Sequence, residues 1–175
     1  MVTFYRRLPK FDYIKPKSTD EALDLLGENS NGDVKVYAGG TDVIPRLKSR
    51  LMQTPKVLID LKGIPGLDYI EYDDKEGLRI GALATISSVA HSVQVREKFG
   101  ILSQAAGSIA STQVQNRGTI VGNICNAVPS ADSAPALLCL GAKLSCVSSR
   151  GERLIDIEDF FTCLLYTSPS PLDQL

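Results

Sequence analysis

The sequence predicts an α+β fold in which a small N-terminal βαβ unit with parallel strands precedes a larger, mainly antiparallel α+β region. Two apolar, β-branched runs, residues 34–38 and 56–61, lie on either side of a helical segment, a pattern typical of parallel strands joined by a crossover. Residues 67–83 and 143–157 each have the pattern of a strand, a polar turn and a second strand, which indicates antiparallel hairpins. Glycine and proline at residues 62–66 mark the expected boundary between the two regions.

In the N-terminal unit, each element has a local signal. Residues 11–16 are extended and end in proline. Ser18 and Glu21 have the spacing of a capping box, so we expect a helix to begin there. A Gly-Gly pair ends the strand at 34–38, and a helix over 43–51 follows, with a proline tolerated in its first turn.

The second region alternates hairpins and helices. We expect a polar-faced helix over 87–98, a helix of small residues over 101–110 and an apolar helix over 132–140. Between the second and third of these helices, residues 111–123 form a long polar stretch that contains glycine. The acidic turn at 73–77 is expected to be a solvated hairpin tip.

The last 13 residues, CLLYTSPSPLDQL, differ in composition from the rest of the chain. They contain two prolines and no basic residue. They are similar to translated adapter sequence, so we expect a non-native tail on a protein truncated after Thr162. The alternative is a genuine flexible tail. The expected organisation is therefore an N-terminal subdomain over 1–62, a second subdomain over 63–162 and the tail over 163–175.

Composition excludes several classes of protein. The chain has 175 residues, a net charge of −1 and a hydrophobic fraction of 43%. The near-neutral charge argues against a nucleic-acid partner, and no apolar run of about 18 residues is present to span a membrane. Four cysteines without a C-x-x-C pair, together with one histidine, predict no metal site. We expect a cytoplasmic protein.

The first segment with chemical potential is Ala38-Gly39-Gly40-Thr41-Asp42, between a strand and a helix. Glycines let a ligand approach the backbone closely, and the N–H groups at the start of a helix favour an anion such as a pyrophosphate. Thr41 or Asp42 can also cap the helix. The alternative interpretation is a tight turn with no ligand. The segment is neither a Walker loop nor G-x-G-x-x-G.

The second segment covers residues 117–132 and is rich in glycine and hydrogen-bonding side chains. Thr119 and Asn123 can donate to phosphate oxygens, and Gly122 permits close approach. Asp132 suits a ribose or ribityl hydroxyl, or alternatively serves only as a helix N-cap. The two segments lie about 80 positions apart, one in each expected subdomain, so a ligand such as a dinucleotide is expected between them.

AGGTD after a strand, followed by RGTIVGNICNAVPSADSAPALL, resembles the FAD-binding subunit of molybdenum hydroxylases. This family includes the medium subunits of xanthine, carbon monoxide and nicotinate dehydrogenases. The resemblance extends over residues 4–162 and implies a two-lobed FAD-binding fold, here without the family's C-terminal domain. It implies that the FAD pyrophosphate lies across both segments, contacted by Ala38, Gly39, Gly40, Thr41, Asp42, Thr119, Gly122, Asn123 and Asn126, with Asp132 at a hydroxyl. Val121 departs from the glycine usual in the family.

The resemblance also implies the mechanism. No residue of this chain is expected to act as a catalytic acid, base or nucleophile, since the flavin carries the chemistry. Substrate is hydroxylated at a molybdopterin cofactor on a large subunit, and electrons pass through 2Fe–2S clusters on a small subunit to FAD and then to NAD or another acceptor. The alternatives are a stand-alone flavin-dependent reductase or oxidase, a non-catalytic nucleotide-binding module, and a fragment that folds yet binds FAD poorly.

Overall fold

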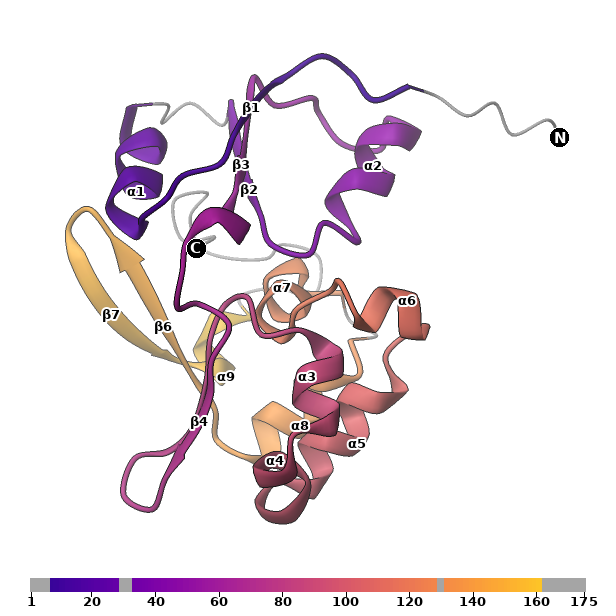
Figure 1. Ribbon diagram of the computed structural model, residues 1–175, viewed down its shortest axis with the longest axis vertical. Coiled ribbons are helices and arrows are strands. Elements are labelled where there is room, and N and C mark those ends of the chain that lie inside the picture. Colours follow the sequence, from indigo (N-terminus) through magenta and orange to yellow (C-terminus); the bar gives the residue numbers. More distant parts are fainter. Residues whose placement is uncertain (1–6, 29–32, 129–130, 162–175) are drawn as a thin grey trace, which may run out of the picture.

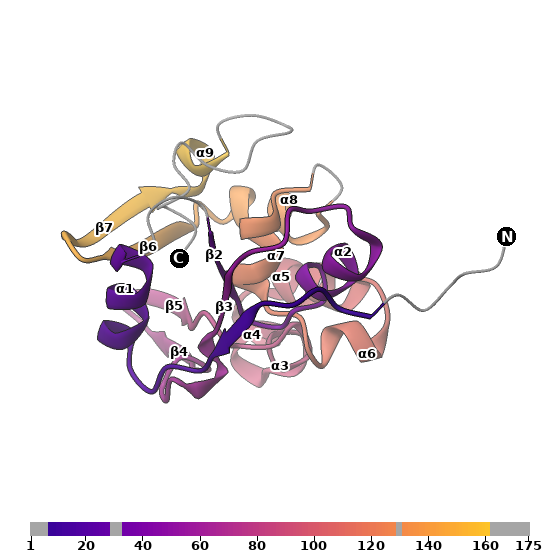
Figure 2. The same ribbon diagram turned by 90° about the horizontal axis from the view of Figure 1, so that it is seen from above.

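The chain begins with a three-stranded parallel sheet in the order β1-β3-β2, seen in a computed structural model that describes residues 7–28, 33–128 and 131–161. The strands are β1 (Asp12–Ile14), β2 (Val34–Tyr37) and β3 (Val57–Asp60). Helices α1 (Thr19–Glu28) and α2 (Val43–Ser49) connect them and flank the strands on opposite sides (Figures 1 and 2). The predicted parallel βαβ unit over 34–61 is confirmed. The predicted tail at 163–175 lies outside the described residues.

Helix α1 begins, and helix α2 ends, for local reasons. The Ser18 hydroxyl accepts a 3.2 Å hydrogen bond from the Glu21 N–H, as predicted for a capping box. The Glu21 carboxylate accepts from the N–H of Lys17 rather than from that of Ser18, at 2.7 Å. Helix α2 stops at Arg50, where φ is +62°, so it is shorter than the expected 43–51.

The central strand β3 holds this unit together. Leu58 and Ile59 are neighbours in the strand, so their side chains point to opposite faces of the sheet, and both are fully buried. Ala22 of α1 and Leu47 of α2 are also buried. A strand covered on both faces explains the continuous apolar run in the sequence.

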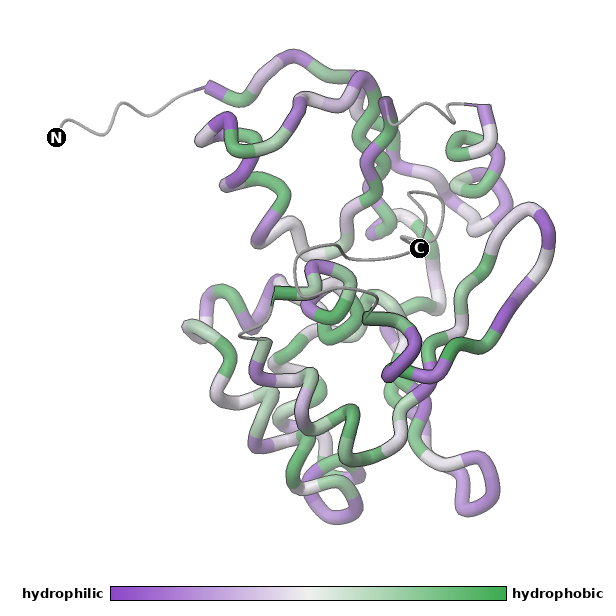
Figure 3. Tube along the Cα trace, turned by 180° about the vertical axis from the view of Figure 1, so that it is seen from behind, coloured by the Kyte–Doolittle hydropathy of each residue, from purple (hydrophilic) through white to green (hydrophobic). Residues whose placement is uncertain are grey.

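Two antiparallel hairpins confirm the predicted character of the second region. They are β4 (Ile70–Asp73) with β5 (Gly77–Ile80), and β6 (Lys143–Ser148) with β7 (Gly151–Asp156). Backbone hydrogen bonds from Gly81 to Tyr69 and from Leu83 to Leu67 extend the first pairing over the predicted length. The tip of the β4–β5 hairpin is hydrophilic throughout (Figure 3).

One predicted helix is two. The helix expected over 87–98 is divided into α3 (Ile86–His91) and α4 (Val93–Lys98). Ser92 lies between them with an extended backbone, and its hydroxyl accepts from the Val95 N–H as the N-cap of α4. The apolar spacing continues across the break because Val89 and Val95 belong to the same core, which is why periodicity alone did not detect it.

The remaining helices are short. Those predicted over 101–110 and 132–140 are confirmed as α5 (Gly100–Ser108) and α8 (Ser133–Cys139). Three short elements were not predicted: α6 (Thr112–Gln115), α7 (Ile120–Asn126) and α9 (Ile157–Phe160). A 3-10 turn, η1 (Leu61–Gly63), follows β3. No described helix combines the length and apolarity needed to cross a membrane.

Helix α7 is anchored by two separate apolar clusters. Ile120 packs into the cluster formed mainly by α3, α4 and α5, whereas Ile124 packs with Ile157 and Phe160 of α9. Both isoleucines are almost completely buried. The fold therefore holds α7 firmly beneath the N-terminal sheet unit, where Figure 1 places it.

Candidate functional site

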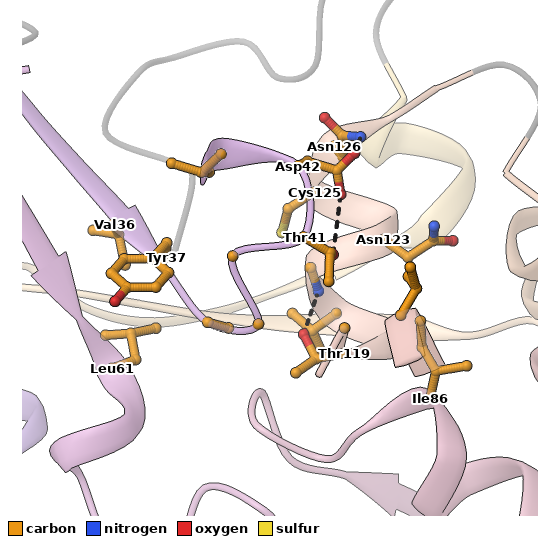
Figure 4. A pocket seen from close by; sticks show the side chains of 18 of the residues that line it. Val36, Tyr37, Thr41, Asp42, Leu61, Ile86, Thr119, Asn123, Cys125 and Asn126 are labelled. Atoms are coloured by element: carbon orange, nitrogen blue, oxygen red, sulfur yellow. Dashed lines mark hydrogen bonds between the residues drawn. The ribbon is translucent and has the colours of Figure 1, made fainter. Parts of the chain in front are cut away.

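A cavity of about 320 Å³ lies between the β2–α2 connection and α7 (Figure 4). Its volume is within the range of small-molecule sites. Both segments singled out in the sequence line it, with Ala38, Gly39, Gly40, Thr41 and Asp42 from the first and Thr119, Gly122, Asn123 and Asn126 from the second. The fold therefore brings together nine of the ten predicted site residues. Asp132 does not line this cavity.

The two segments meet backbone to backbone at Gly39. A Cβ atom on Gly39 would lie 2.1 Å from the carbonyl oxygen of Arg117 and 2.7 Å from the Cα of Gly118. No side chain fits there, so glycine is required for the contact between the two halves of the site. The sequence interpretation gave Gly39 only the role of opening the backbone to a ligand. Gly40, next to it, has a φ of +77°, which favours glycine.

Asp42 and Asn126 connect the far ends of the two segments. The Asn126 side-chain amide donates a 2.9 Å hydrogen bond to the Asp42 carboxylate. Asp42 occupies the N-cap position of α2 but makes no side-chain capping bond there, so the expected capping role is wrong for Asp42. Figure 4 shows Asp42 and Asn126 side by side, with Thr41 also turned towards α7.

Thr119 is the N-cap of α7. Its hydroxyl oxygen accepts a 2.9 Å hydrogen bond from the N–H of Gly122, and its side chain is almost fully buried. A Cβ on Gly122 would lie only 2.8 Å from that hydroxyl oxygen. The backbone just before Thr119 is itself fixed, because the Gly118 carbonyl accepts a 2.9 Å bond from Ile86 N–H. Thr119 and Gly122 thus form one capped helix start that faces the cavity.

Asn123 is held by a residue that sequence reasoning missed. The hydroxyl of Ser133, which is fully buried, donates a 2.6 Å hydrogen bond to the Asn123 side-chain oxygen. Since that oxygen is engaged, a ligand contact by Asn123 would use its amide nitrogen as donor. Asp132, adjacent to Ser133, is at the N-cap position of α8, as the alternative interpretation proposed, but makes no side-chain capping bond. The one signal in the sequence for a role of Ser133 was its position next to Asp132, which was a predicted site residue.

The charges around the cavity favour an anion. Lys35 and Arg46 line it, and among the residues that the structure describes Asp42 is the one carboxylate in the lining. Burial lowers the pKa of Lys35, and the nearby Arg46 lowers it further. Burial raises the pKa of the Cys125 thiol to about 11, so this cysteine is neutral rather than a thiolate. Two cationic side chains, hydroxyl and amide donors and a glycine-rich backbone fit the pyrophosphate of a dinucleotide such as FAD.

The roles of Lys35 and Arg46 were not anticipated. Lys35 reads as an ordinary alternating strand residue and Arg46 as a polar helix residue, because neither lies inside a motif. Their positions flanking the Gly-Gly segment were the only signal. Their approach to one cavity depends on the β2–α2 turn, which a local pattern does not specify.

Comparison with known proteins gives a consistent result. A family model described as "FAD binding domain in molybdopterin dehydrogenase" matches residues 9–171. The chain is 36% identical over 152 residues to caffeine dehydrogenase subunit beta of Pseudomonas sp. (strain CBB1), which covers 86% of this chain and 50% of that protein. It is also 36% identical over 163 residues to 6-hydroxypseudooxynicotine dehydrogenase complex subunit alpha of Paenarthrobacter nicotinovorans, covering 93% and 54%.

The fold agrees with these matches. A chain of the reconstituted CO dehydrogenase from Oligotropha carboxidovorans has a TM-score of 0.87 and 32% sequence identity, covering 94% of this chain and 57% of that chain. The chain spans about half the length of the relatives it matches. The resemblance inferred from the two glycine-containing segments is confirmed, and the chain belongs to the family of FAD-binding domains of molybdopterin dehydrogenases.

Proposed function

We propose that this chain binds FAD in the cavity between the β2–α2 connection and α7, as part of the electron-transfer subunit of a molybdenum hydroxylase. The convergence of both glycine-containing segments on one cavity carries the proposal, since the segments are far apart in the sequence. The donor-rich, cationic lining suits the pyrophosphate, which is the part of FAD with the strongest charge.

The residues of this chain have separate tasks in the proposed complex. Thr119 and Asn123 would hold the pyrophosphate with side-chain donors, while the backbone at Gly39 and Gly40 would approach it closely. Lys35 would supply positive charge nearby. Bound FAD would supply the electron transfer, accepting electrons from one partner and releasing them to another. Asp132 stays a predicted contact to a ribose or ribityl hydroxyl.

The wider assembly is part of the same proposal. We propose a molybdopterin-binding large subunit and a small subunit with 2Fe–2S clusters as partners, NAD or another acceptor as the electron sink, and a cytoplasmic location. Two relatives support an assembly, since they are named as dehydrogenase subunits. We also propose the predicted division into subdomains near residue 62.

A visible absorbance spectrum tests the proposal directly. The purified chain is mixed with FAD, desalted and measured, and we expect a retained two-band flavin spectrum. A protein that is folded by circular dichroism but colourless contradicts FAD binding by this chain. The alternatives give other results. A stand-alone reductase would oxidise NADH in the absence of any partner, whereas a non-catalytic nucleotide module would bind ADP but retain no flavin.

A further inference from the structure

A buried carboxylate links all three strands of the parallel sheet through hydrogen bonds, at the end of the sheet nearest the cavity. Asp60 is the last residue of β3 and is only 3% exposed. It accepts a 2.5 Å hydrogen bond from the hydroxyl of Tyr13 on β1 and a 3.1 Å bond from the hydroxyl of Tyr37 on β2. It also accepts from the backbone N–H of Lys62, at 3.0 Å. One side chain therefore fixes the ends of three strands relative to one another.

Lys62 extends this group to the candidate site. Its ammonium nitrogen lies 2.7 Å from the Asp60 carboxylate, 3.9 Å from the centre of the Tyr37 ring and 2.5 Å from the backbone carbonyl oxygen of Ala38. Ala38 is the first residue of the segment that lines the cavity. Lys62 itself does not line the cavity. Lys62 therefore contacts the backbone of the cavity wall at Ala38 without facing the cavity itself.

The ionisable side chains of this group, Asp60, Lys62 and Tyr37, stabilise one another's protonation states. Burial by itself would raise the pKa of Asp60, but hydrogen bonds from Lys62 and Tyr13 outweigh that effect and hold its pKa below the ordinary value. Burial and the neighbouring Asp60 raise the pKa of Tyr37, so its phenol stays a hydrogen-bond donor. A carboxylate this deeply buried needs its cation, and the same cation is the one that contacts Ala38.

We infer that Lys62 is a positioning residue for flavin binding. Its ammonium group bridges the Asp60 carboxylate and the Ala38 carbonyl oxygen, and so fixes the start of the Ala38–Asp42 segment. This inference rests on the proposed function. The segment is then held at three points: Lys62 at its beginning, the Gly39–Arg117 contact next to it and the Asn126–Asp42 hydrogen bond at its end. A segment held in advance binds its ligand without paying to order the loop.

The experiment compares two lysines at opposite ends of the same strand. Lys62→Met removes the charge and donors while keeping the length of the side chain. The matched control is Lys56→Met, because Lys56 pairs with Asp33 just before β3 and its side chain is 76% exposed. FAD affinity is measured by quenching of flavin fluorescence, under conditions where urea unfolding shows each variant to be folded. We expect Lys62→Met to weaken FAD binding about tenfold or more, and Lys56→Met to leave it unchanged.

Two further variants separate positioning from general stability. Lys62→Arg keeps the cation and its donors and is expected to bind FAD more tightly than Lys62→Met, which a simple loss of packing would not predict. Tyr13→Phe removes one hydrogen bond to Asp60 on a residue that is 53% exposed, and is expected to fold and to weaken binding by a smaller factor. It keeps the inference testable if Lys62→Met does not fold.

The outcomes are distinct. Equal FAD affinity for Lys62→Met, Lys56→Met and the unchanged chain overturns the role of Lys62, while FAD binding stands. Weak binding by both Lys62→Met and Lys62→Arg, with normal binding by Tyr13→Phe, also overturns it, because the effect then does not pass through the Asp60 group. Failure of the unchanged chain to bind FAD overturns the proposed function, and this inference with it.

Discussion

The side-chain amide of Asn126 donates a hydrogen bond of 2.9 Å to the carboxylate of Asp42, joining two residues 84 positions apart. Asp42 precedes α2, and Asn126 is the last residue of α7. Both line the same cavity, so this contact sets the distance between its two walls at one end. Each half of the site thus depends on the other for its geometry.

Asn126→Asp tests this connection. The substitution keeps the size of the side chain but replaces the donor with a carboxylate facing Asp42, so the two walls are expected to repel each other. We expect FAD affinity to fall about tenfold, with partial recovery at high salt, since the pair is exposed to solvent. Fluorescence titration at low and high salt measures both. Asn116→Asp, outside the cavity lining, serves as the control and should bind FAD normally.

Gly39→Ala tests the backbone contact. The added methyl would lie 2.1 Å from the Arg117 carbonyl oxygen, so the two segments must separate. We expect a loss of unfolding free energy of about 1–3 kcal/mol and loss of flavin retention after desalting. Gly107→Ala is the control, because a Cβ there meets nothing within 4 Å inside α5, and it should be neutral or stabilising by up to about 1 kcal/mol. Similar urea midpoints for the two variants would refute this reading of Gly39.

Thr119→Val tests the helix cap next to the cavity. Valine keeps the shape of threonine but loses the hydroxyl that accepts the Gly122 N–H, so the start of α7 loses its cap. We expect a loss of about 1 kcal/mol in unfolding free energy, together with faster hydrogen exchange of the Gly122 amide. Thr119→Ser keeps the hydroxyl and should retain both properties. An unchanged exchange rate at Gly122 in Thr119→Val would show that the cap contributes nothing.

Asp60→Asn tests the pH dependence of stability. Because the folded-state pKa of Asp60 is lowered, its stabilisation is present above the unfolded-state pKa, about 3.9, and is lost as the pH falls through the folded-state value. The unchanged chain should therefore lose unfolding free energy below about pH 4, and the variant should lose less over that range. Urea unfolding at a series of pH values measures the difference. Parallel stability curves for the two proteins would contradict a stabilising role of the carboxylate.

Much of the architecture could be predicted because its signals are local. The β-branched runs of β2 and β3, the capping box at Ser18 and Glu21 and the polar hairpin turns each specify an element through residues a few positions apart. The helix break at Ser92 and the short helix α7 were missed because neither has a clear local signal. Continuous apolar spacing hid the first, and a glycine-containing polar segment did not indicate the second until Thr119 was seen to cap it.

The sequence by itself determined the parallel unit, the two hairpins and the two segments of the candidate site, including nine residues that line one cavity. Only the tertiary structure decided which contacts hold those residues in position. Gly39 accommodates the Arg117 carbonyl, Ser133 holds Asn123, and Lys62 holds Ala38. Each of these contacts joins residues separated along the chain by 10 to 78 positions. Local patterns specify backbone conformation, whereas a contact across the fold depends on how packed elements bring distant side chains together.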